Sequence, residues 1–250
     1  MRIISLDLST LTFEQTTTAI LQLATEKKGG YTCVANVHMC IEAWQDPSFA
    51  STVNGATIVT PDGMPLVKAM NWLYQTNQER VAGMDLLPAL LGRLENMAIP
   101  CLFYGGTEEM LNHTQKYLQE HFPKLTNCHF ESPPFRPLNE TEKQAFIDFI
   151  AEKQIGLVFV ALGCPKQEKF MAEMSPQINA HLIGIGGALP VMVGMQKRAP
   201  EWMQKNSLEW LYRLMQEPKR LFKRYFITNS LFILLFCKQL ISQKLFKKHS

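Results

Sequence analysis

The stretch Leu157-Val-Phe-Val-Ala-Leu-Gly-Cys-Pro-Lys-Gln-Glu168 sets an apolar run directly before a glycine turn and the start of a helix. Short apolar runs without strict polar alternation are typical of parallel strands that are covered on both faces. The same order of apolar run, turn and amphipathic stretch recurs along the chain. It predicts alternating strands and helices, which is the pattern of an α/β fold.

The apolar pattern on both sides of this stretch predicts the remaining elements. The expected strands are Ile3–Leu8, Tyr31–Asn36, Ala56–Thr60, Ile99–Tyr104, Asn127–Glu131, Leu157–Leu162 and His181–Ile185. The expected helices are Phe13–Lys27, Met64–Gln75, Asp85–Met97, Glu108–Glu120, Thr141–Lys153 and Lys166–Met174. The fold class that follows is a Rossmann-like, mostly parallel sheet flanked by helices.

Composition and charge divide the chain into a body and a tail. The 250 residues are 46% hydrophobic and 19% charged, which excludes a disordered chain, a collagen-like repeat and a coiled coil. Residues 213–250 hold nine Lys or Arg and one acid, a net charge of +8, whereas the rest of the chain carries −5. We therefore expect an α/β core over residues 1–200 and a helical, basic, membrane-associating appendage over residues 201–250. The net charge of +3 gives no reason to expect a nucleic-acid partner.

The cysteines and the N-terminus indicate a cytoplasmic protein. The six cysteines form no CxxC pair, and no nearby histidine completes a zinc spacing, so no metal site is expected. The first ten residues combine one positive charge with a short apolar stretch and an early aspartate. They do not form a signal peptide.

Three of the expected strands end in glycine and lead into a helix, and these turns are candidates for a phosphate site. Gly105, Gly163, Gly186 and Gly187 would let backbone amides approach a phosphate, with Lys166 beside the second turn. The alternative is that the glycines only close tight turns. The third turn lacks the last glycine of a dinucleotide fingerprint, and the chain has no Walker lysine motif.

The densest group of polar residues lies in Thr60-Pro-Asp-Gly-Met-Pro-Leu-Val67 and Glu79-Arg-Val-Ala-Gly-Met-Asp-Leu-Leu-Pro88. Asp62 follows a strand and precedes a helix, where a carboxylate can face a cleft. The alternative for Asp62 is a helix N-cap, worth about 1 kcal/mol. For Arg80 and Asp85 the alternative is a surface ion pair of small consequence.

These motifs resemble the WecG/TagA/CpsF family of glycosyltransferases, glycosyltransferase family 26. The resemblance covers nearly the whole chain and continues through Leu162-Gly-Cys-Pro-Lys-Gln-Glu168, Gly184-Ile-Gly-Gly-Ala188, Lys197-Arg-Ala-Pro-Glu-Trp202, Glu209-Trp-Leu-Tyr-Arg213 and Glu217-Pro-Lys-Arg220. It implies that a hexose moves from a UDP-sugar to a polyprenyl-diphosphate-linked saccharide, with inversion, during cell-envelope polysaccharide or teichoic acid synthesis. The implied hexose is N-acetylmannosamine, its uronic acid, glucose or glucuronic acid.

The resemblance also implies roles for individual residues. Asp62 matches the catalytic base, and Gln167, a second catalytic candidate, matches a polar residue close to the substrate that could hydrogen-bond sugar hydroxyls. The alternative for Gln167 is a side chain near a helix start that only faces water. Asn36, at the end of the second expected strand, matches the family's asparagine in that loop, although Val34 and Ala35 occupy the places where a threonine is usual, which puts a hydroxyl contact in doubt. The diphosphate is expected to meet arginines, for which the candidates are Arg80, Arg213, Arg220 and Arg224.

The chain contains no Asp-x-Asp motif, which many nucleotide-sugar transferases use to hold a divalent metal. We therefore predict activity without a metal or other cofactor. Two other functions are weighed against this one. One is a nucleotide-dependent enzyme of different chemistry with Cys164 as nucleophile, although Cys164 has no evident histidine partner. The other is a non-catalytic membrane scaffold on a transferase fold.

The tail has the composition of a helix that lies in a membrane interface. Only 13 residues separate Arg224 from Lys238, and as a helix they cover about 20 Å, against the roughly 30 Å of a hydrocarbon core. We therefore expect peripheral attachment to an anionic inner leaflet rather than a membrane span. The alternative is that Phe222, Tyr225 and the leucines of the tail pack on the body or on a second subunit, which would make a homo-oligomer.

Overall fold

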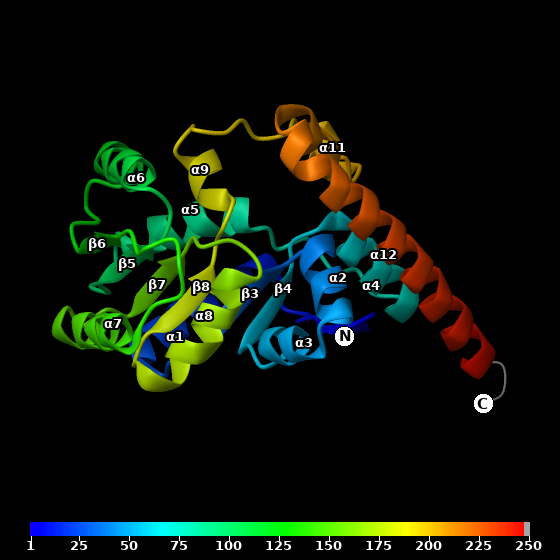
Figure 1. Ribbon diagram of the computed structural model, residues 1–250, viewed down its shortest axis with the longest axis horizontal. Coiled ribbons are helices and arrows are strands. Elements are labelled where there is room, and N and C mark those ends of the chain that lie inside the picture. The colour runs from blue at the N-terminus through cyan, green and yellow to red at the C-terminus, as the bar shows by residue number, and fades with distance from the viewer. Residues whose placement is uncertain (248–250) are drawn as a thin grey trace.

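Six parallel strands form the central sheet of the molecule (Figure 1). The computed structural model describes the backbone of residues 1–247 and the side chains of residues 1–243. In spatial order the strands are β4 (Ile58–Pro61), β3 (Tyr31–Ala35), β8 (His181–Gly184), β7 (Leu157–Val160), β5 (Cys101–Tyr104) and β6 (Cys128–Glu131). The predicted α/β class is confirmed, and these strands match predicted segments to within two residues at each end.

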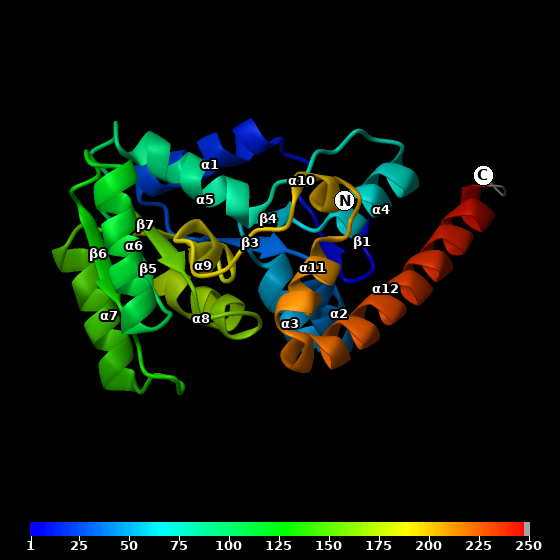
Figure 2. The same ribbon diagram turned by 90° about the horizontal axis from the view of Figure 1, so that it is seen from above.

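Helices cover both faces of this sheet (Figure 2), because successive strand residues point to opposite sides. Phe103 and Phe159 belong to one buried cluster, whereas Leu102 and Val158 belong to the other. The first cluster packs under α1 (Phe13–Glu26), α5 (Gly83–Leu94), α6 (Glu108–His121) and α9 (Ala188–Met192). The second packs under α2 (Val37–Gln45), α3 (Pro47–Asn54), α4 (Met64–Tyr74), α7 (Glu140–Glu152) and α8 (Lys166–Met174).

The first expected strand, Ile3–Leu8, is wrong as predicted. The segment forms a small antiparallel pair, β1 (Arg2–Ile3) with β2 (Leu6–Asp7), which is separate from the main sheet. Ile4 turns the chain with a φ of 54°, in the left-handed region, so the apolar run folds back on itself. The helices α2 and α3 are additions that the apolar pattern does not predict.

The appendage contains α10 (Glu201–Lys205), α11 (Glu209–Gln216) and the long α12 (Pro218–Lys247), which runs along the outside of α2 and α4 (Figures 1 and 2). One stripe of α12 is buried: Leu221, Thr228, Phe232 and Phe236. Further along, the Gln239 side chain accepts a hydrogen bond from the Ile4 N–H (2.9 Å) and donates one to the Arg2 carbonyl (3.0 Å). Residues 248–250 of the predicted appendage lie outside the described residues.

The opposite stripe of α12 is apolar and exposed, with Phe222, Phe226, Ile233 and Ile241 at its surface. The helix from Pro218 to Gln243 is long and apolar enough to cross a membrane, judged by length and composition alone. The uncharged run of 13 residues is thus part of a longer helix, and the short length of this run does not by itself exclude a membrane span by α12. Phe222 does not pack on the body, whereas Leu221 does.

Candidate active site

The three glycine turns lie together at the carboxyl edge of the sheet, because β5, β7 and β8 are parallel neighbours. Gly105 has a φ of 112°, and a Cβ atom there would lie 2.8 Å from the backbone of Ala161 at the end of β7. Only glycine allows the β5 and β7 turns to approach this closely. The turns form one continuous edge.

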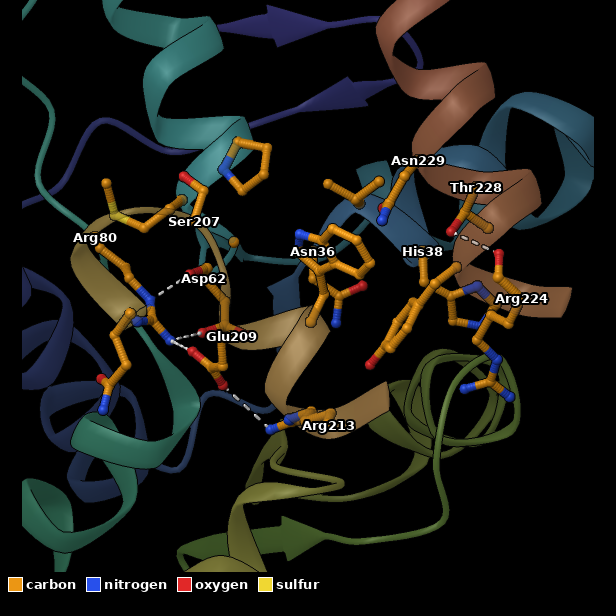
Figure 3. A pocket seen from close by; sticks show the side chains of 17 residues that line it. Asn36, His38, Asp62, Arg80, Ser207, Glu209, Arg213, Arg224, Thr228 and Asn229 are labelled. Carbon is orange, nitrogen blue, oxygen red and sulfur yellow. Dashed lines mark hydrogen bonds and ion pairs between the residues drawn. The ribbon is translucent and has the colours of Figure 1, made fainter. Parts of the chain in front are cut away.

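At one end of this edge a cavity of about 170 Å³ lies between the core and the appendage (Figure 3). The core and the appendage each supply several of the residues that line it. Its polar lining includes Asn36, His38, Asp62, Arg80, Glu209, Arg213, Arg224 and Tyr225. Five predicted site residues therefore meet here, and segments more than 100 residues apart in the sequence face each other across the cavity.

Asp62 presents its carboxylate to the cavity and does not cap α4. The N-cap of α4 is Gly63, which offers no side chain, so the capping alternative does not apply. The Asp62 backbone N–H donates to the carbonyl of Ala35 (2.9 Å), which ties the residue to β3. Burial raises the pKa of Asp62 to about 6; the charge of Arg80 opposes this rise, and the charge of Glu209 adds to it.

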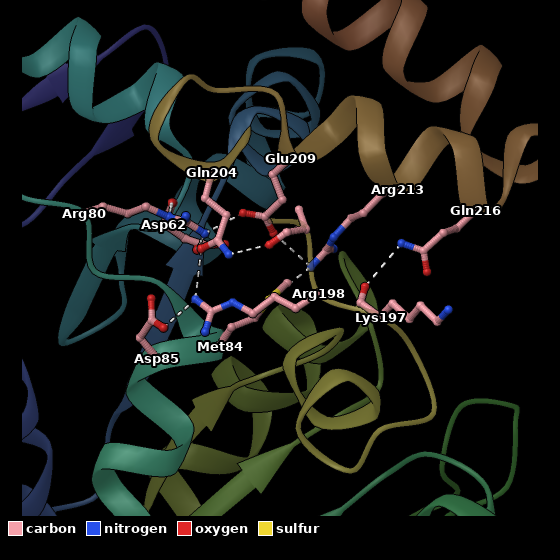
Figure 4. A network of polar contacts seen from close by, with 11 residues as sticks. Asp62, Arg80, Met84, Asp85, Lys197, Arg198, Gln204, Glu209, Arg213 and Gln216 are labelled. Atoms are coloured by element: carbon pink, nitrogen blue, oxygen red, sulfur yellow. Dashed lines mark hydrogen bonds and ion pairs between the residues drawn. The ribbon is translucent and has the colours of Figure 1, made fainter. Parts of the chain in front are cut away.

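A chain of charges connects Asp62 to the appendage (Figure 4). Arg80 Nε donates to the Asp62 carbonyl at 2.6 Å, and Arg80 Nη2 lies 3.4 Å from Asp62 Oδ1 and 2.8 Å from Glu209 Oε2. Arg213 Nη2 lies 3.4 Å from the other oxygen of Glu209. Only 14% of the Arg80 side chain is exposed, so the ion pairs that Arg80 makes are not surface ion pairs. Asp85 does not pair with Arg80 but with Arg198.

Two residues that begin α2 also border the cavity. Asn36 is the N-cap of α2, and its side chain accepts a hydrogen bond from the Met39 N–H at 3.1 Å. Burial, together with the nearby charge of Arg224, lowers the pKa of His38 to about 4, so His38 is neutral at pH 7. The prediction for Asn36 placed it correctly at this edge, whereas His38 was missed.

Gln167 lies beneath the glycine turns and lines neither the first cavity nor the larger one beyond β5 and β7. Its Oε1 accepts from the Gly163 N–H (3.2 Å), and its Nε2 donates to Glu168 (2.7 Å). A Cβ atom on Gly186 would lie 3.2 Å from the same Oε1. Only 5% of Gln167 is exposed, and its side chain contacts two of the turns in this structure. Its predicted role toward the sugar stays a prediction.

The remaining predicted residues are divided between the edge and the surface. Lys166 lines a second, more apolar cavity of about 370 Å³ beyond β5 and β7. A Cβ atom on Gly187 would lie 3.4 Å from the guanidinium of Arg213, which lines the first cavity, whereas none of the four predicted glycines lines it. Arg220 lines neither cavity; its guanidinium pairs with Glu217, and more than half of its side chain is exposed.

Two further features bear on the alternative chemistries. Burial, with the nearby Glu168 carboxyl, raises the pKa of the Cys164 thiol, which disfavours the thiolate that a nucleophile needs. Within residues 1–243, no cluster of three or more His, Cys, Asp or Glu is arranged to hold a metal ion. The predicted independence of metal stays a prediction.

Comparisons with known proteins match this chain to a family model and to a relative of named activity. The model of the glycosyl transferase WecG/TagA/CpsF family matches residues 1–245. The N-acetylglucosaminyldiphosphoundecaprenol N-acetyl-beta-D-mannosaminyltransferase of Bacillus spizizenii is 31% identical to this chain over 198 residues, which cover 78% of this chain and 74% of the relative.

Proposed function

The chain belongs to the WecG/TagA/CpsF family of glycosyltransferases, and from this premise we propose that it moves a hexose from a UDP-sugar to a polyprenyl-diphosphate-linked saccharide with inversion. The name of the Bacillus spizizenii relative gives N-acetylmannosamine as the transferred sugar and a diphosphoundecaprenol-linked N-acetylglucosamine as the acceptor. We propose the same classes of sugar and acceptor for this chain. The observation that carries the proposal is the Asp62 carboxylate, held in a cavity beside arginines.

In the proposed reaction Asp62 is the general base. Its carboxylate takes the proton of the acceptor hydroxyl as that oxygen bonds to the anomeric carbon, and the bond from this carbon to the UDP oxygen breaks. A single displacement of this kind inverts the anomeric carbon, and general-base assistance contributes roughly 10² to 10⁴-fold to the rate. With a pKa of about 6, Asp62 is mostly ionised at pH 7 while still basic enough to accept a proton.

The departing UDP gains negative charge, which the cavity can meet with guanidinium groups. Arg80, Arg213 and Arg224 all line it, and charge-assisted hydrogen bonds from arginine to phosphate are short and strong. The third glycine turn approaches Arg213 at Gly187, and we propose that its backbone amides add to the binding of the nucleotide. We propose that these groups serve in place of a metal ion.

The appendage is proposed to hold the enzyme on the inner face of the cell membrane. The exposed apolar stripe of α12 is flanked by Lys219, Lys223 and Lys238, an arrangement that suits an anionic lipid surface. The opposite stripe packs on the body from Leu221 to Gln239. A helix held along its side in this way cannot cross a bilayer unless it leaves the body, which favours peripheral attachment.

The experiment that tests this function incubates the full chain with a panel of UDP-sugars and a short-chain lipid-diphosphate acceptor carrying one sugar. Mass analysis identifies the product, and NMR of the new linkage gives its anomeric configuration. We expect one donor to yield a product that is longer by one hexose derivative, with inverted configuration. A folded protein that neither extends the acceptor with any donor nor binds UDP would support a non-catalytic scaffold instead.

A further inference from the structure

We infer that Glu209 holds the place of the donor diphosphate in the ligand-free protein, and that the donor binds by displacing this carboxylate from Arg80 and Arg213. The inference rests on the proposed function, because it takes a nucleoside diphosphate as the ligand of these arginines. It goes beyond that function by assigning a role to an acidic residue of the appendage.

The geometry around Glu209 is that of a bridging anion. Its two carboxylate oxygens contact two different arginines, Arg80 at 2.8 Å and Arg213 at 3.4 Å, one from the core and one from the appendage (Figure 4). A diphosphate also offers separate oxygens to separate guanidinium groups. The carboxylate and the diphosphate therefore compete for the same donors.

The size of the cavity points to the same conclusion. At about 170 Å³ it is smaller than the roughly 300–1,000 Å³ that ligand pockets usually offer. The side chain of Glu209 is part of its wall and lies between the two arginines (Figure 3). Withdrawing this side chain enlarges the cavity at the point where the guanidinium groups converge.

The side chain of Glu209 is able to move aside. Glu209 is the first residue of α11, no residue of which is fully buried, so its side chain can turn away while Arg213, one turn further along, stays in place. This helix follows a short connection in which Ser207 has a φ of 64°, a left-handed conformation that is unusual for serine. The contacts of Glu209 are mainly electrostatic, and a diphosphate brings more negative charge to the same arginines than one carboxylate does.

The test measures binding of UDP by calorimetry at low ionic strength. Glu209→Gln removes the competing charge at constant size, and we expect it to bind UDP about three- to tenfold more tightly than the wild type. Uridine, which has no phosphate, should bind the two proteins equally. Glu201→Gln is the matched control, because Glu201 is likewise the first residue of an appendage helix but pairs with the exposed Lys205. The affinity of this variant for UDP should not change.

Glu209→Asp keeps the charge but shortens its reach, and UDP should bind this variant with an affinity between those of the wild type and Glu209→Gln. It carries the test if Glu209→Gln does not fold. Suppose that the Glu209 variants bind UDP as tightly as the wild type or more weakly, and that Arg80→Ala weakens UDP binding. This result would overturn the role of Glu209 but leave the proposed diphosphate site intact. If no protein binds UDP, or if Arg80→Ala binds it as tightly as the wild type, the proposed diphosphate site itself is wrong.

Discussion

At the scale of single residues, the environment of Asp62 sets its working pH. Burial raises the pKa of Asp62 to about 6, and a general base acts only when it is ionised. We expect kcat/KM to rise with pH through a midpoint near 6 and to level off above about 7. A pH–rate profile at low donor concentration measures this limb. A rate that is constant from pH 5 to 8 would contradict the assignment of Asp62 as base.

The same burial means that ionised Asp62 lowers the stability of the folded protein. Its folded pKa lies above the ordinary value of 3.8, so the ionised form destabilises the fold at neutral pH, and this penalty shrinks as pH falls below about 6. We expect Asp62→Asn to raise the free energy of unfolding at pH 7.5 by about 1–3 kcal/mol, and by less at pH 5. Urea unfolding at the two pH values provides the comparison, and a less stable variant at pH 7.5 would be evidence against this ionisation.

Individual site residues could be predicted only where the sequence carries a motif. Asp62 and Arg80 lie in one short segment, and the resemblance to a family added Asn36, Arg213 and Arg224, all of which line the first cavity. Glu209 also lies within a motif, but the motif reveals no role for it, because its partner Arg80 is 129 residues away in the sequence. Spacing also could not show that Gln167 points beneath the turns.

At the scale of elements, α12 has two apolar stripes; one is buried against the body, and the other is exposed. Phe222, Phe226 and Ile233 on the outer stripe are each more than 60% exposed. We expect the triple substitution of these residues by serine to weaken binding to anionic vesicles at least about tenfold, because burial of such side chains contributes about 1.5–3 kcal/mol each. Cosedimentation with vesicles containing phosphatidylglycerol measures the loss.

The control for this prediction is Phe135→Ser. Phe135 is the most exposed of the large apolar side chains described and lies between β6 and α7, away from α12. Its substitution should leave vesicle binding unchanged. Equal binding of the wild type and the triple variant would show that the outer stripe of α12 does not contact lipid.

Most elements followed from apolar periodicity, and one of those that did not, α3, had another signal. Asp46 and Pro47 begin α3 with a side-chain cap and a proline in the first turn, which is a recognisable start signal. Periodicity does not detect this helix, because α2 and α3 are short and their apolar faces are brief. The fold-back at Ile4 has no such signal, since isoleucine rarely adopts a positive φ.

At the scale of the whole molecule, cationic groups from distant segments converge on one cavity. Arg80 belongs to the core, and Arg213 and Arg224 belong to the appendage. We expect this positive charge to stabilise the departing UDP without a divalent ion, so that turnover is unchanged after removal of metal with EDTA. Assays with and without added Mg²⁺ or Mn²⁺ decide the point, and a strict requirement for either ion would refute it.

The parallel sheet and a separate basic tail were both foreseeable, because periodicity and charge are local properties of a sequence. The closure of the cavity by the appendage was not, because it depends on pairings such as Arg80 with Glu209 and Asp85 with Arg198. Such contacts leave no trace in local spacing. The division into a core of residues 1–200 and an appendage of residues 201–250 therefore stays a prediction about folding, although both parts build the cavity.

The most direct measurement compares sugar transfer and UDP binding in Asp62→Asn with those in the wild type. If Asp62 is the base, transfer to the lipid-diphosphate acceptor falls by at least about a hundredfold, while UDP binds no more weakly than before because the arginines are retained. If Asp62→Asn transfers sugar at the rate of the wild type, the base lies elsewhere and the proposed mechanism is wrong.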